Sequence, residues 1–354
     1  MGGIPPTGVP GLWSRTMILG KRKISILFIV GVIINLTFSH CGKREKINYS
    51  EGNFESVTIK HVSTGLPTIN SAVDANGNIY AICKNDIWKI EPGSKKEKII
   101  FENGIGPNQI YKPLKIIFFN GQCWVNSLFY YKFIYCFSAN SLNPKLENIK
   151  LIDFNCFDDF TPIRKDKIIA VNVYWRDGLL KVYDFKTGEI KRLGKPEFIK
   201  LMLKFNVNSA SVAVLNDMAY VIQSIKPEIQ IFSLKKLQKI DTISLTPPFY
   251  KKIPGKYNIG KYDHSSHINW MSKWTRLHNI FVENGWIFIC YRKGYEKKFY
   301  YEIINANDRK HRWFIDETDN YIYDFKIVKG TVYIKMSEEN EGGISWKEAE
   351  LSLP

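Results

Sequence analysis

The stretch Asn284-Gly285-Trp286-Ile287-Phe288-Ile289 joins a two-residue turn to an apolar run, and this pattern decides the fold. Asn-Gly between apolar runs is the strongest short-range hairpin signal, because both turn residues tolerate a positive φ. After each turn comes a run of β-branched and aromatic residues, as at 79–82 and 168–171. Equivalent turns stand at Asn76-Gly77, Asn120-Gly121, Lys165-Asp166, Asn216-Asp217 and Lys329-Gly330.

These turns recur at a nearly constant interval. Counted from the second turn residue, the spacings are 44, 45, 51, 68 and 45 residues. A period near 45 with four strands per unit is typical of a β-propeller blade. The sequence therefore predicts an all-β, six-bladed β-propeller over residues 55–354, with a β-sandwich of many hairpins as the second candidate.

The two ends of this region predict how the ring closes. The sixth unit supplies strands near 323–328, 331–336 and 345–353 and then lacks a fourth. The alternating segment 56–62 has no partner of its own. We expect this N-terminal strand to complete the last blade, because pairing would remove two exposed sheet edges.

One segment between the first two units resembles a known family. Residues 101–113, Phe-Glu-Asn-Gly-Ile-Gly-Pro-Asn-Gln-Ile-Tyr-Lys-Pro, are similar to the Gly-Pro linker between blades of six-bladed propellers of the NHL-repeat-like kind. Asn108 stands where that linker has Gly, and Ile110 where it has Phe. The resemblance implies a fold found in exported bacterial lipoproteins and implies no particular activity.

The N-terminus has the pattern of an export signal. Three basic residues, Lys21, Arg22 and Lys23, precede an uncharged apolar run at 24–39. This run is shorter than an ordinary membrane-spanning helix. Cys41 follows with a polar segment, which resembles a lipoprotein signal, although His40 and Phe38 depart from that pattern. We expect 1–40 to be a signal or anchor segment, with Met17 as an alternative start of translation, and 41–54 to be a linker.

Composition narrows the function class. The 354 residues carry a formal net charge of +16, with 45% hydrophobic and 14% aromatic residues, which excludes a disordered chain. Export argues against nucleic acid as the partner of this basic protein. We expect a monomer outside the cytoplasm, held to the membrane by a lipid or anchor, with a protein, glycan or anionic partner in the cell envelope. A soluble cleaved form, or lysines that merely solubilise the surface, are the alternatives.

The 68-residue spacing is about 23 residues longer than the period and places an insertion at about 246–275. Loops on a rigid scaffold often carry function, and aromatic and cationic side chains suit sugar rings or anions. The alternative is that these aromatic residues pack the insertion onto the rim. The candidate ligand-face residues are Tyr130, Tyr131, Lys132, Trp175, Arg176, Tyr257, Tyr262, His264, His267, Trp270, Trp274 and Tyr295.

Catalytic motifs are scarce in this sequence. The pair His264 and His267 lacks a third ligand at a recognisable spacing, so we expect no metal and no cofactor there. Asp158 and Asp159 are expected to diverge as solvated loop charges. The predicted function is a binding or scaffolding module; the alternative is a propeller hydrolase or lactonase whose central divalent cation is held by dispersed ligands.

Overall fold

The computed structural model describes residues 45–46, 58–62, 70–91, 96–102, 104, 106, 109–127, 133–150, 157–175, 177–197, 209–245, 247, 249–253, 264–293, 299–315, 322–328, 331–337 and 344–350. In β2 and in β23 to β25, the description covers the backbone only. The chain divides into two compact units, Met1–Lys43 and Arg44–Pro354, and all described residues lie in the second.

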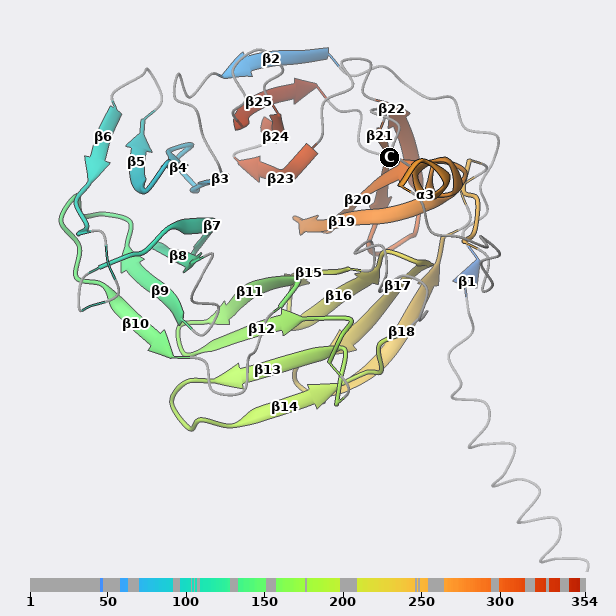
Figure 1. Ribbon diagram of the computed structural model, residues 1–354, viewed down its shortest axis with the longest axis horizontal. Coiled ribbons are helices and arrows are strands. Elements are labelled where there is room, and N and C mark those ends of the chain that lie inside the picture. The colour runs from blue at the N-terminus through green and yellow to red at the C-terminus, as the bar shows by residue number, and fades with distance from the viewer. Residues whose placement is uncertain are drawn as a thin grey trace, which may run out of the picture. The chain divides into compact units, whose positions relative to one another are not determined.

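The described chain is an all-β propeller. Five sheets each consist of four consecutive antiparallel strands, and their first strands surround a common centre (Figure 1). The first three sheets are β3 (Asn70–Val73), β4 (Ile79–Cys83), β5 (Asp86–Ile90) and β6 (Lys96–Ile99); β7 (Pro113–Phe119), β8 (Gln122–Ser127), β9 (Phe133–Ser138) and β10 (Glu147–Lys150); and β11 (Asp159–Arg164), β12 (Lys167–Val171), β13 (Leu180–Asp184) and β14 (Ile190–Leu193).

The next two sheets follow the same plan. They are β15 (Ala210–Leu215), β16 (Met218–Gln223), β17 (Lys226–Ser233) and β18 (Gln238–Ser244); and β19 (Thr275–Glu283), β20 (Trp286–Lys293), β21 (Phe299–Asn305) and β22 (His311–Ile315). The helix α3 (His264–Met271) lies in the connection between them. A short strand, β1 (Glu45–Lys46), adds to β18 in parallel as a fifth strand, which the sequence did not predict.

A further four-stranded sheet joins the two ends of the propeller unit. It contains β23 (Ile322–Val328), β24 (Thr331–Ser337) and β25 (Ile344–Glu350), and its fourth strand is β2 (Thr58–Val62). β2 pairs antiparallel with β25, with Thr58 opposite Glu350 and Val62 opposite Trp346. The pairing expected of the N-terminal strand is therefore present over Thr58–Val62; Ser56 and Val57 lie outside the described residues.

The core lies between neighbouring sheets rather than between two large layers. Between the third and fourth sheets, Val171 and Val182 pack with Val212, Val221 and Phe232. Similar buried clusters lie between the first and second, second and third, and fourth and fifth sheets. Successive face-to-face contacts around a centre are the packing of a propeller, so the β-sandwich alternative is wrong.

The predicted turns have the expected geometry at three of the described positions. Asn120 and Gly121, Asn216 and Asp217, and Asn284 and Gly285 all have positive φ. At Asn76-Gly77 only Gly77 does, and the loop is longer, because the Asp74 carboxylate accepts the amides of Asn76 and Asn78 at 2.8 and 2.9 Å.

The Lys165-Asp166 turn differs for another reason. Neither residue has a positive φ, and the strand register shifts between Pro162 and Arg164 instead. A bulge of this kind adds twist that a turn with negative φ does not supply.

Each blade has two distinct ends. A repeated hydrogen bond marks one of them: the amide after the third strand donates to the carbonyl of the second turn residue. The pairs are Ala139 to Gly121, Phe185 to Asp166, Leu234 to Asp217 and Ala306 to Gly285. We call this end, with the first-to-second and third-to-fourth strand turns, the hairpin face. The opposite end, where the first strands begin, is the strand-start face.

Candidate functional site

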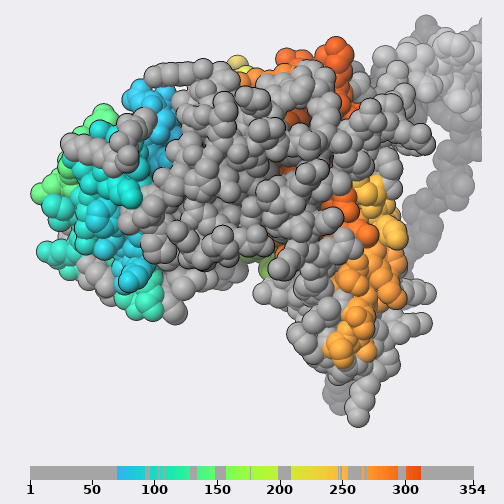
Figure 2. Space-filling model, turned by 90° about the horizontal axis from the view of Figure 1, so that it is seen from above, coloured from blue at the N-terminus to red at the C-terminus, as the bar shows by residue number. Residues whose placement is uncertain are grey.

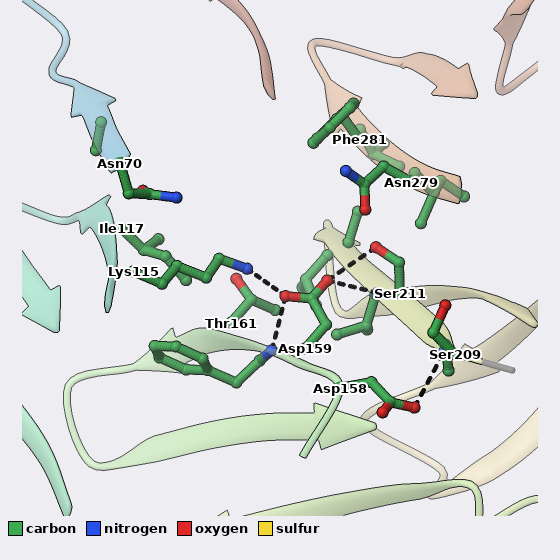
Figure 3. A pocket seen from close by; sticks show the side chains of 18 of the residues that line it. Asn70, Lys115, Ile117, Asp158, Asp159, Thr161, Ser209, Ser211, Asn279 and Phe281 are labelled. Atoms are coloured by element: carbon green, nitrogen blue, oxygen red, sulfur yellow. Dashed lines mark hydrogen bonds and ion pairs between the residues drawn. The ribbon is translucent and has the colours of Figure 1, made fainter. Parts of the chain in front are cut away.

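A cavity of about 380 Å³ lies where the first strands of five sheets converge. Its lining comes from β3, β7, β11, β15 and β19, with Asp158 and Ser209 just before two of these strands. Figure 3 shows polar side chains from separate strands directed toward this space. They are Asn70, Lys115, Asp159, Thr161, Ser211 and Asn279, and Ile117, Ala213 and Phe281 add apolar surface.

Strand irregularities place some of these residues. In β7 the register shifts between Pro113 and Lys115, and in β19 it shifts between Leu277 and Asn279. A bulge re-aims the side chain that follows it. Lys115 and Asn279 are thus equivalent positions, each directly after a bulge in its innermost strand and six residues before the second residue of the turn that follows.

Asp159 connects three sheets. One carboxylate oxygen forms an ion pair with the ammonium of Lys115 from the second sheet. The same oxygen accepts a hydrogen bond of 2.9 Å from the backbone amide of Phe160, the next residue in the chain. The other accepts the hydroxyl of Ser211 at 2.8 Å and the amide of Val212 at 3.1 Å, both in the fourth sheet. With its acceptor sites occupied, Asp159 is a structural clasp that holds Lys115 at the cavity wall.

Asp158 diverges from Asp159, as the sequence predicted, but it is also bonded to backbone. Its carboxylate accepts the amide of Val173 at 3.1 Å and that of Ala210 at 3.0 Å. Desolvation by the surrounding protein raises the pKa of this carboxyl to about 6, and the two amide hydrogen bonds oppose the shift. The expectation that both aspartates are merely solvated loop charges is therefore wrong.

Two further residues define the cavity wall. The side-chain oxygen of Asn70 accepts the amide of Ile116 at 3.3 Å, and its nitrogen is directed toward the cavity (Figure 3). His278 is the extra residue of the β19 bulge. Burial, followed by the positive charges of Arg276 and Arg292, lowers the pKa of His278 to about 4, so its imidazole is neutral at physiological pH.

The wall thus carries side-chain amides, hydroxyls, an ammonium and an aromatic ring, and the ammonium of Lys115 and the hydroxyl proton of Ser211 are both directed to Asp159. This set can hydrogen-bond a polar molecule and cover an apolar face of it. Within the described part of the chain, no group of three or more His, Cys, Asp or Glu residues is arranged to hold a metal ion.

The residues predicted from sequence do not gather at this cavity. Trp175 is only 8% exposed and packs beneath the ammonium of Lys181, which lies 4.4 Å from the ring centroid. Trp270 and Trp274 contact each other edge to face at 5.9 Å, at the end of α3 and just beyond it.

The remaining predicted site residues have no described side chain. His264 and His267 both lie in α3, and only their backbone is described. The others lie outside the described residues: Cys41, Tyr130, Tyr131, Lys132, Arg176, Tyr257, Tyr262 and Tyr295.

The insertion is anchored by its first part. Thr275 and Lys251 exchange hydrogen bonds of 2.9 and 3.1 Å, and Phe249 stacks on Tyr300 at 4.6 Å. Figure 2 shows the orange part of the chain, which includes α3, projecting to one side of the sheets. In its described part, therefore, some aromatic residues pack the insertion onto the fifth sheet.

Sequence reasoning missed the cavity residues, although a signal was present. Asn70, Lys115, Asp159, Ser211 and Asn279 each stand six or seven residues before the second residue of their turn. The repeat that revealed the blades therefore also marks these five cavity-lining residues. The aromatic and cationic loop residues were predicted as the ligand face instead, because their composition suits sugar rings or anions.

The comparisons with known proteins agree with the fold. No family model matches the sequence, NHL repeats included, and no curated protein matches it. A solved structure of a "Putative exported protein" from Bacteroides fragilis has a TM-score of 0.56 and 10% identity, covering 87% of this chain and 98% of its own. A member of the DUF4221 family from Bacteroides vulgatus has a TM-score of 0.56 and 11% identity, covering 88% and 100%. At such low identity these similarities show that the chain shares a fold with these proteins, and the fold is a β-propeller.

Proposed function

We propose that this protein is an exported, membrane-anchored β-propeller that binds a small hydroxyl-rich ligand, such as a sugar residue, in its central cavity. We further propose that the sheet of β2 and β23 to β25 acts as a sixth blade that closes the ring. The observation that carries the binding proposal is the convergence of polar side chains from five separate strands on one cavity.

The size and chemistry of the cavity support this ligand class. Its volume of about 380 Å³ is near the small end of the roughly 300–1,000 Å³ typical of ligand pockets. It therefore suits a small molecule or the end group of a larger one. The amides of Asn70 and Asn279 can donate to and accept from ligand hydroxyl groups, the oxygen of Ser211 can accept, and Phe281 can cover the apolar face of a sugar ring.

The register of β23 supports a sixth contribution to the ring. Asp324 follows a register shift after Ile322, as Lys115 and Asn279 follow theirs. Its backbone therefore occupies the corresponding position, directly after the bulge of its strand. We infer that Asp324 is the residue of β23 that corresponds in register to Lys115 of β7 and Asn279 of β19.

Export and anchoring are supported by the N-terminal sequence. The basic residues at 21–23, the apolar run at 24–39 and Cys41 form the pattern of a lipoprotein or anchor signal. One protein of similar fold carries the word exported in its name. Among the described residues no helix is long and apolar enough to cross a membrane, and the 24–39 run lies outside them.

The binding proposal is tested by calorimetric titration of the full chain in detergent with neutral, N-acetylated and acidic mono- and disaccharides. We expect at least one of them to bind, and Asn279→Ala to weaken binding about tenfold or more, because one hydrogen-bonding group is lost. Asn307→Ala, at an exposed turn on the hairpin face, is the matched control and should bind as wild type. The proposal is wrong if no sugar binds, or if Asn279→Ala and Asn307→Ala bind equally well.

A further inference from the structure

The central cavity has two levels of different chemistry. Alternate residues of a strand point to the same face of its sheet, and they lie about 6–7 Å apart along the strand. The first level, nearer the strand-start face, is the polar set Asn70, Lys115, Asp159, Ser211 and Asn279. The second level, two residues further along each strand, is Ala72, Ile117, Thr161, Ala213 and Phe281. The corresponding positions in β23 are Asp324 and Lys326, of which only the backbone is described.

The second level is mostly apolar. On the five strands whose side chains are described, Thr161 carries its only hydroxyl group. Ile117, Ala213 and Phe281 are half-buried, whereas the residue directly before each of them is buried between two sheets. These three side chains therefore offer apolar surface to the cavity that they line.

The strand register confirms that the two levels share a face of each sheet. Beyond its bulge, β7 pairs regularly with β8 from Lys115 to Ile117, and β19 pairs regularly with β20 from Asn279 to Phe281. The packing agrees with this register. Lys115 forms an ion pair with Asp159 of the third sheet, and Ile117 packs against the apolar cluster between the second and third sheets.

We infer that the ligand of this cavity is amphiphilic: a sugar unit at the first level carries an apolar substituent, such as an aryl or short alkyl group, at the second level. The inference rests on the proposed function and specifies its ligand class. Phe281, which can cover the apolar face of the sugar ring, belongs to the second level, so one apolar surface continues from the ring to the substituent. A free sugar leaves Ile117 and Ala213 facing water, whereas an apolar substituent buries them, which favours binding.

The experiment is calorimetric titration of the full chain in detergent with paired glycosides. The probes are the methyl and phenyl glycosides of glucose, N-acetylglucosamine and glucuronic acid. We expect the phenyl glycoside of at least one sugar to bind about tenfold or more tightly than its methyl glycoside, because the second level removes the phenyl group from water. Equal affinities within every pair would overturn the inference.

Four variants locate the substituent through the ratio of the two affinities. Ile117→Thr places a hydroxyl group in the second level, and Ala213→Leu fills the space there, so each should lower the preference for phenyl over methyl about threefold or more. Ile240→Thr, the same substitution at a 38% exposed position of β18, is the matched control and should keep the wild-type ratio. Asn279→Ala should weaken both glycosides by a similar factor, because it removes a contact to the sugar. If Ile117→Thr and Ala213→Leu both keep the wild-type ratio, the second level does not hold the substituent and the inference is wrong.

Other outcomes separate this inference from the proposed function. If none of the glycosides binds, the proposed sugar site is wrong and the inference fails with it. If methyl and phenyl glycosides bind equally well, the sugar site stands and only the apolar substituent is wrong. If phenol alone binds as tightly as the phenyl glycoside, the first level does not recognise the sugar, which contradicts both.

Discussion

The central cavity and the hairpin face use charge in different ways. In the cavity, the carboxylate of Asp159 is tied to the second and fourth sheets through Lys115, Ser211 and Val212. At the hairpin face, lysines such as Lys235 and Lys236 extend into solvent without an ion pair in the described structure. A charge that is satisfied across sheets stabilises the ring, whereas a charge left in solvent is available to a partner.

The largest expected effect comes from removing the Asp159 carboxylate. Asp159→Ala should lower the free energy of unfolding by about 3 kcal/mol, because Lys115 loses its partner and the donors on Ser211 and Val212 lose their acceptor. Chemical denaturation measures this loss. Glu189→Ala, which removes an exposed ion pair with Lys191, should cost less than about 0.5 kcal/mol, and an equal cost at both sites would contradict the comparison.

The next prediction compares two glycine-to-alanine substitutions, one at each end of the blades. Gly194 follows β14 with φ of 66°, and an added Cβ would lie 2.9 Å from the buried ring of Phe232. Gly194→Ala should therefore cost about 2–3 kcal/mol, from backbone strain plus overpacking. Gly121, in a hairpin turn with φ of 75°, has open space around it, so Gly121→Ala should cost about 1 kcal/mol. Thermal unfolding of both variants measures the two losses of stability. Equal losses would show that the contact with Phe232 adds nothing to the cost at Gly194.

Asp158 predicts a pH effect confined to the strand-start face. Its folded-state pKa of about 6 is above the ordinary value of 3.8, so its stabilising contribution is full below about pH 4 and is lost as the pH rises through 6. Asp158→Asn keeps an acceptor oxygen for Val173 and Ala210 but cannot ionise. Relative to wild type, the variant should gain up to about 1 kcal/mol between pH 4 and 7, an estimate that allows for the solvent access of this residue.

Denaturation of wild type and Asp158→Asn across this pH range measures the difference. A difference that stays constant with pH would show that Asp158 does not titrate in this window. Comparing the two proteins at each pH cancels the contributions of carboxylates such as Asp184, whose pKa is lowered by its hydrogen bond to Lys167.

The smallest effect is expected at the hairpin face. Replacing Lys165, Lys235 and Lys236 together by Gln should change the free energy of unfolding by less than about 0.5 kcal/mol, because none of them forms an ion pair with a described residue. Chemical denaturation at low and moderate salt measures this change. A loss of several kcal/mol would mean that these lysines stabilise the fold, and it would contradict the comparison between the two regions.

Much of the fold could be predicted from local chemistry. Asn120-Gly121 and Asn284-Gly285 adopt the positive φ values that their side chains allow, and the interval between such turns indicated repeated blades. The candidate site could not be predicted in the same way. Trp175 looked like a ligand-face residue and is buried, because burial depends on which sheet packs against it.

The sequence by itself determined where hairpins form, how often they repeat and that the N-terminus resembles an export signal, because turn conformation and apolar patterning depend on neighbouring residues. The tertiary structure alone decided that Asn70, Lys115, Asp159, Ser211 and Asn279 meet at one cavity. These residues are separated by more than 200 positions in total, and only the packing of successive sheets around a centre brings them together. It also decided that β1 adds to β18, since pairing at an open sheet edge depends on which strand remains exposed after the blades have formed.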